Sequence, residues 1–194
     1  MAQTDNHVLA QATHDLGSAL WLGGAVMGVA GVNKSGADLS QGIDRIRVAS
    51  SAWGRFAPVE WAGIGATLLA GSRLTQVGGR RMVLQKGFAS VGALKAGIAV
   101  AGAAATAFAA YSGGRIGKLA EEAHARGEAI EVKDATVPTD RTPPKIAKWQ
   151  RRQRASQYAV PVLAGANIVC GSYLVQSYRL GATTRGVLGR LLPG

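Results

Sequence analysis

Residues 14–33 read HDLGSALWLGGAVMGVAGVN, a nearly charge-free stretch that contains five glycines. In a water-soluble helix each glycine costs about 1 kcal/mol relative to alanine. In lipid, by contrast, helices associate through close backbone approach, which glycine permits and leucine blocks. The stretch therefore favours a helix that crosses a membrane.

The composition of the chain agrees with this interpretation. Of its 194 residues, 47% are hydrophobic and 17% are charged, and the formal net charge is +11. The charged fraction lies below the roughly 25% that is typical of soluble domains. The length fits one domain, which we place at residues 1–194.

Four stretches are almost free of charge and close to the roughly 20 residues that a bilayer requires. They are residues 16–32, 56–71, 88–111 and 158–178. A soluble four-helix bundle would need a charged face on each helix, but residues 88–111 carry a single charge, Lys95. The sequence predicts an all-α fold: a four-span transmembrane helical bundle with a basic, partly helical inner loop at residues 112–157.

Small residues recur at helical spacing in two of these stretches. Gly24 and Gly28 form a G-x-x-x-G pair, and Gly92, Ala96, Ala99 and Ala103 offer the same kind of small-residue spacing in the third stretch. We expect these residues to be helix-packing positions, and packing within the chain is favoured over self-association.

Lysine and arginine counts in the connections predict the orientation, because cytoplasmic loops are enriched in both residues. The first and third connections carry fourteen of them, whereas the second connection and the tail carry seven, and the segment before the first stretch carries none. We expect a multi-pass protein of the bacterial plasma (inner) membrane with both termini outside.

The long third connection divides into three parts. Residues 115–132 look helical, with Ile116, Leu119, Ala120 and Ala123 on one face. Residues 133–144 contain three prolines and break the helix. A basic segment then leads into the last stretch.

That basic segment carries five cations and an interleaved tryptophan. The residues are Lys145, Lys148, Trp149, Arg151, Arg152 and Arg154. Beside a membrane span, such a cluster is typical of binding to anionic lipid headgroups or to an acidic partner protein. Nucleic acid is not expected as a partner, because no nucleic-acid-binding module surrounds the cluster.

Three polar residues fall inside the predicted spans: Glu60, Lys95 and Asn167. Intramembrane ionisable groups are costly and mark functional sites by default. We expect local partners, with Lys95 reaching toward Asp15 or the outer headgroups and Glu60 toward Arg55 or Arg45. The alternative is a relay through Glu60, Asn167 and Lys95 that moves protons or binds a small polar ligand.

His14 precedes the first stretch and could ligate haem or copper. A bis-histidine haem site needs a second histidine at membrane depth, and neither His7 nor His124 lies there. We therefore expect no metal and no cofactor.

The segment HDLGSALWLGG at residues 14–24 resembles the opening of the copper-resistance-D-like and related uncharacterised bacterial four-helix membrane families. RFAPVEW at residues 55–61 is similar to their second span. The resemblance implies a polytopic bacterial membrane protein that handles a metal or a small solute. The chain has few other histidines and methionines, so no copper ligands are carried over.

No pair of residues has the spacing that acid–base or nucleophilic catalysis demands, and we expect no catalytic residue and no enzyme activity. The sequence predicts an accessory or structural membrane subunit that packs through small-residue faces and docks lipids, other membrane proteins or a second copy. Two alternatives stay open: a small transporter or channel using Glu60, Asn167 and Lys95, and a haem- or metal-binding protein centred on His14.

Overall fold

The computed structural model describes residues 2–77 and 88–191, and its side chains are described for residues 7–76 and 89–176. The described part of the chain is helical, apart from two connections and one isolated bridge between Val132 and Pro138. Its elements are α1 (Ala2–Met27), the π-helix η1 (Gly28–Val32), α2 (Asn33–Ser35), the 3-10 helix η2 (Gly36–Asp38), α3 (Gly42–Val77), α5 (Phe88–Ala125) and α6 (Pro144–Leu191). The all-α prediction is confirmed.

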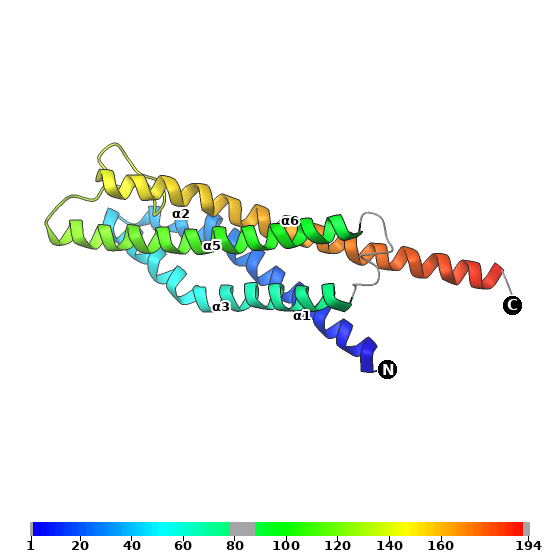
Figure 1. The fold of residues 1–194 in the computed structure, drawn as a ribbon. Coiled ribbons are helices and arrows are strands. Elements are labelled where there is room, and N and C mark those ends of the chain that lie inside the picture. The colour runs from blue at the N-terminus through cyan, green and yellow to red at the C-terminus, as the bar shows by residue number, and fades with distance from the viewer. Residues whose placement is uncertain (1, 78–87, 192–194) are drawn as a thin grey trace.

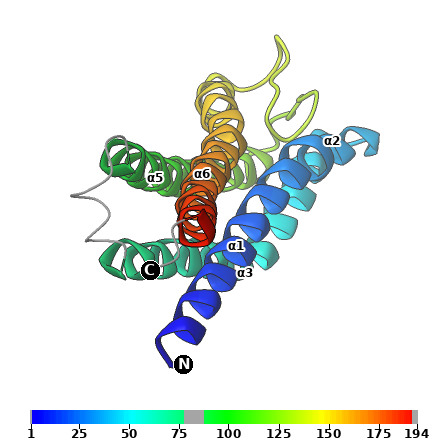
Figure 2. The same ribbon diagram turned by 90° about the vertical axis from the view of Figure 1, so that its right-hand side faces the viewer.

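The four long helices form an elongated bundle in which α1 pairs with α3 and α5 pairs with α6 (Figures 1 and 2). The connections that follow α1 and α5 lie at one end of the bundle, called here the loop end. Both ends of the chain point away from it (Figure 1). The first and third connections therefore lie together.

Within the described residues, three helical segments are long and apolar enough to cross a membrane: His7–Asp38, Ala89–Ala125 and Pro144–Gln176. The sequence predicted four such segments. The helix that differs is α3, whose apolar part is short because it is bounded by Arg55 and Arg73 and interrupted by Glu60.

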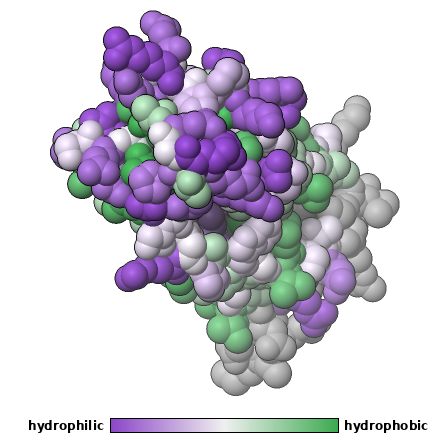
Figure 3. Space-filling model, turned by 90° about the vertical axis from the view of Figure 1, so that its left-hand side faces the viewer, coloured by the Kyte–Doolittle hydropathy of each residue, from purple (hydrophilic) through white to green (hydrophobic). Residues whose placement is uncertain are grey.

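Two separate clusters form the core. Trp21, fully buried, packs with Ala25, Ile64, Val160 and Ala164 in the apolar half of the bundle. A second cluster at the loop end contains Ile43, Ile46, Ile116, Ala120, Ala123, Ile130, Val132 and Ile146. Its members include three of the four residues that the sequence placed on one face of 115–132, and Leu119 packs against it. Figure 3 looks onto the loop end, where hydrophilic side chains gather.

Helix α5 continues without a break past its apolar part, but it ends at Ala125, which is earlier than the predicted residue 132. Gly127 stops it by adopting a φ of +72°, a left-handed conformation that glycine enters without steric cost. The connection that follows is held against the bundle. Arg45 donates hydrogen bonds to the carbonyl oxygens of Val132 (2.7 Å) and Lys133 (3.2 Å).

Glycines bring α1 close to α3. A Cβ atom on Gly17 would lie 2.6 Å from the carbonyl oxygen of Gly63, so the two backbones touch at this crossing. Gly24 and Gly28 do not meet another backbone. They lie beneath the rings of Phe56 and Trp53, respectively. These two glycines accommodate aromatic side chains rather than a second small-residue face.

The prediction for the third stretch was wrong in one respect. Ala96 is exposed in the structure, because it lies on the outward side of α5, whereas Ala99, three residues later, is buried. Gly92 is half-buried. Ala99 and Ala103 belong to the same predicted set, and Ala103 packs against the Trp21 cluster. The spacing therefore found the inward side of the helix but also included one residue of the outward side.

Candidate functional site

A chain of three polar side chains lies near the start of α5. The Lys95 amine donates a hydrogen bond to His14 Nε2 at 2.7 Å, and His14 Nδ1 lies 3.1 Å from Asp15 Oδ1. Gln11 also donates to that carboxylate, at 2.8 Å. His14 is 2% exposed, whereas the Asp15 side chain is 63% exposed. Lys95 thus reaches Asp15 only through His14, a bridge that the sequence analysis did not anticipate.

The other two helices leave room for this chain by presenting glycines. A Cβ atom on Gly71 of α3 would lie 3.5 Å from the His14 ring, and one on Gly171 of α6 would lie 3.5 Å from Lys95. All four long helices therefore meet at His14. Both ring nitrogens of His14 are engaged, an arrangement that leaves neither free for a metal ion. Among the described residues, no group of three or more His, Cys, Asp or Glu side chains gathers.

Asn167 takes part in a second polar contact, one helical turn further along α1. Its amide donates to Ser18 Oγ at 3.4 Å, and Ser18 Oγ lies 3.3 Å from Thr67 Oγ1. Asn167 is 1% exposed, and its Oδ1 has no hydrogen-bond partner. Buried amide oxygens without a partner are rare in native structures. Asn167 thus joins α6 to α1 and α3, and it makes no hydrogen bond to Lys95 or Glu60.

Glu60 lies apart from both contacts. Its side chain is 5% exposed and lines a cavity of about 260 Å³ that lies among all four helices and the third connection. The prediction that Glu60 reaches toward Arg45 or Arg55 was wrong. Arg45 bonds to backbone carbonyls instead, and in the described part of the chain Glu60 has no hydrogen-bond or ion-pair partner.

A hydrogen-bonded network closes the loop end of this cavity. Trp53 donates to Asn33 Oδ1 (2.9 Å), Asn33 donates to Gln157 Oε1 (2.8 Å), and Gln157 donates to Thr136 Oγ1 (3.3 Å). Asn33 follows directly after the π-helical turn η1. The network joins α2, α3 and α6 to the third connection, so the walls of the cavity are held in place.

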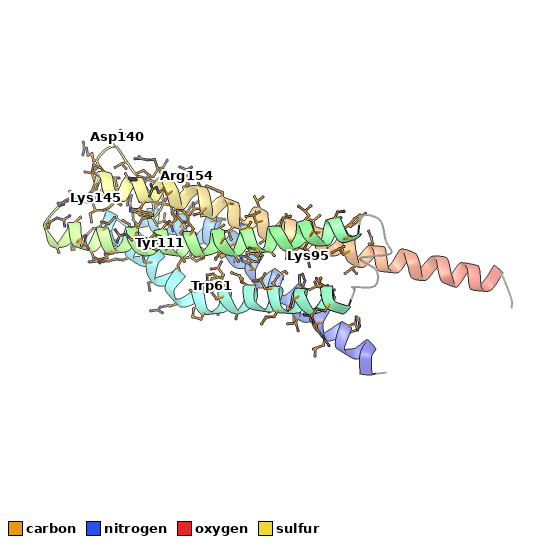
Figure 4. All side chains as sticks on the ribbon, viewed as in Figure 1. Trp61, Lys95, Tyr111, Asp140, Lys145 and Arg154 are labelled. Atoms are coloured by element: carbon orange, nitrogen blue, oxygen red, sulfur yellow. The ribbon has the colours of Figure 1, made fainter. Side chains whose placement is uncertain are left out.

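The basic cluster lies on α6 at the loop end, where Figure 4 labels Lys145 and Arg154. Its five cations are exposed, and none forms an ion pair with an acid within residues 7–76 and 89–176. Trp149 is half-buried among them. Its ring lies 5.0 Å from the Arg152 guanidinium, 6.0 Å from that of Arg115 and 5.5 Å from the Tyr111 ring.

Three arginines elsewhere at this end have acidic partners. Arg47 donates two hydrogen bonds of 2.7 Å to Glu121, ten residues beyond the apolar part of α5. Arg126 pairs with Glu128 and Arg141 with Glu131. The α6 cluster differs from these three arginines because it gathers five cations around one tryptophan without an acidic partner among the described side chains.

Sequence reasoning missed the polar residues that connect the helices. Ser18, Trp21, Asn33 and Thr106 were not predicted as contacts, yet Trp21 donates to Thr106 Oγ1 at 3.1 Å. One signal was available: His14, Ser18 and Trp21 follow an i, i+4, i+7 spacing, which places them on one face of a helix.

Comparison with protein-family models, with curated protein sequences and with solved structures gives no match to this chain.

Proposed function

We propose that the chain is a non-enzymatic, four-span bundle of a bacterial inner membrane whose basic α6 face binds anionic lipid headgroups, as an accessory or structural subunit would. The observation that carries this proposal is the run of exposed cations without acidic partners around Trp149. Lys145, Lys148, Trp149 and Arg152 follow an i, i+3, i+4, i+7 pattern and so form one stripe along α6.

The stripe combines cations with an aromatic ring, a composition typical of segments that lie among lipid headgroups. Tryptophan and tyrosine prefer the membrane–water interface, and each cation near an anionic surface contributes about 1 kcal/mol. Trp149 and Tyr111 stack edge to face beside two arginines, close to where the apolar part of α5 ends. In this proposal the Trp149 and Tyr111 rings set how deep the stripe lies in the membrane interface, and the cations attract the anionic headgroups.

The arrangement of α3 supports four crossings. This helix runs antiparallel to α1 and packs along it, and its N-terminal end meets the third connection, where Gly42 lies against the Ile130 carbonyl. A helix packed along a membrane-spanning neighbour shares its layer. Glu60 of α3 is buried within the bundle and not exposed to lipid. For this reason α3 does not need to be as apolar as a helix that inserts into the membrane without neighbours.

The test measures lipid retention by the purified protein. We expect the Lys148→Gln/Arg152→Gln variant to retain phosphatidylglycerol about thirtyfold more weakly than the parent, at about 1 kcal/mol per cation. Native mass spectrometry in mixed phosphatidylglycerol/phosphatidylcholine micelles provides the measurement. The Lys118→Gln/Lys133→Gln variant loses the same charge from exposed positions at the same end and serves as the matched control. Equal retention by both variants contradicts the proposal.

A second candidate function is a polar relay, favoured by the Lys95–His14–Asp15 chain and by the unpartnered Oδ1 of Asn167 one turn away. Such a chain connects an exposed carboxylate to a half-buried amine. Proton flux into proteoliposomes under an imposed membrane potential tests this function. Flux that is lost in Lys95→Met but kept in Lys118→Met supports the relay, whereas no flux above protein-free vesicles excludes it.

A further inference from the structure

Among the side chains that the structure describes, Glu60 is the one buried acid, and the docking function does not explain it. Its side chain is 5% exposed and lines the cavity. Within the described residues its carboxyl group has neither a hydrogen-bond partner nor an ion-pair partner. A carboxylate buried without a partner is strongly unfavourable, so such groups are paired in native proteins, take up a proton, or face water or a ligand. The Glu60 carboxyl group is therefore available to a ligand that enters the cavity.

The cavity walls are mostly apolar and include two tryptophans, Trp53 and Trp61. The other buried polar side chains that line the cavity are engaged. Thr106 accepts from Trp21 and donates to the Gly102 carbonyl, while Asn33 and Gln157 belong to the network described above. Glu60 is therefore the acceptor that a ligand would meet. An apolar cavity that presents a carboxyl group favours a ligand that brings positive charge together with an apolar body.

The cavity also reaches the surface. Gly54 and Trp61 of α3 and Ala110 and Gly114 of α5 all line it and are exposed. A ligand can therefore enter between these two helices. Figure 4 labels Trp61 on α3.

We propose that this cavity binds a small organic cation with an apolar body, whose charged nitrogen faces the Glu60 carboxylate and whose body lies against Trp53 and Trp61. Aromatic faces attract organic cations, and a carboxylate in a water-poor pocket supplies the opposite charge. The site is separate from the α6 stripe and extends the function of the chain beyond lipid docking.

Benzyltrimethylammonium is the probe, since it is permanently charged and carries an apolar ring. Isothermal titration of the detergent-solubilised full chain should give saturable binding that weakens tenfold or more in Glu60→Gln. Glu122→Gln removes an exposed acid from α5 and should leave the affinity unchanged. Benzyl alcohol keeps the ring and a hydrogen-bond donor without the charge, and Glu60→Gln should not alter its binding. A smaller loss with Glu60→Gln, or the absence of saturable probe binding to the parent, overturns the proposal.

A second measurement uses the parent protein alone and does not depend on the folding of a variant. An apolar carbodiimide should modify Glu60, as peptide mass analysis detects, and the probe should slow this modification tenfold or more. Modification that proceeds at the same rate with and without the probe contradicts the assignment of the site. Lipid retention by the α6 stripe stays intact in either case, so failure of this site and failure of the docking function are distinguishable.

Discussion

Lys95 on α5 and His14 on α1, which are 81 positions apart in the sequence, are joined by a hydrogen bond of 2.7 Å. Glycines on the two remaining long helices flank the pair, so this one contact reports on the assembly of the whole bundle.

The pair should contribute measurably to stability. Hydrogen bonds between membrane helices average about 0.6 kcal/mol in double-mutant cycles and reach about 1.7 kcal/mol. A cycle of His14→Phe and Lys95→Met should give a coupling of about 1 kcal/mol in the free energy of unfolding, measured by denaturant titration in mixed micelles. A control cycle combines His14→Phe with Lys118→Met, which removes a lysine of α5 that does not contact His14. If both cycles give zero coupling, the hydrogen bond does not hold α5 to α1.

Gly28 should tolerate alanine poorly, because a Cβ atom there overlaps the Trp53 ring. That ring is fixed by its hydrogen bond to Asn33, so it cannot move without breaking the network. We expect Gly28→Ala to lower the free energy of unfolding by about 1–3 kcal/mol, the usual cost of overpacking.

Gly23 provides the matched control for this substitution. It lies in α1, five residues before Gly28, and a Cβ atom added there would have no neighbouring atom within 4 Å. Gly23→Ala should leave stability unchanged or raise it, because alanine favours the helix. Equal destabilisation by the two substitutions would show that the ring does not lie over Gly28.

The third connection should loosen when Arg45 is removed. Arg45 donates to the carbonyl oxygens of Leu39, Val132 and Lys133. Arg45→Met should speed amide hydrogen exchange at residues 128–139 about tenfold, because hydrogen bonds to a charged group contribute about 1.5–3 kcal/mol. Arg141→Met removes an 80% exposed arginine from the same connection and should have little effect. If amide hydrogen exchange at residues 128–139 is unchanged in Arg45→Met, Arg45 does not hold the third connection against the bundle.

Much of the fold follows from local patterns. Charge-free stretches predicted helices, prolines predicted the break after α5, and the 3.6-residue period placed Ile116, Ala120 and Ala123 in a core. These features depend on residues that are neighbours along the chain. The end of α5 was misplaced by seven residues because Gly127 stops the helix before the apolar pattern does.

The contacts between helices could not be predicted in the same way. His14 meets Lys95, and Glu60 faces a cavity, because of how far each helix slides and rotates against its neighbours. Where nearly every residue is small and apolar, as on α5, the sequence does not mark the buried side. For this reason the exposed Ala96 was predicted to pack together with Ala99 and Ala103, which do face the bundle.

The central claim is that α3 crosses the membrane beside α1, and the sidedness of two exposed connection residues tests it most directly. Ala37 and Asp140 can each be replaced by cysteine in a Cys170→Ser background, since Cys170 is the sole cysteine of the chain. A membrane-impermeant maleimide is then applied to right-side-out and to inverted vesicles. With four crossings, both cysteines react from the same side of the membrane. With crossings by α1, α5 and α6 alone, they react from opposite sides, and that result would contradict the account.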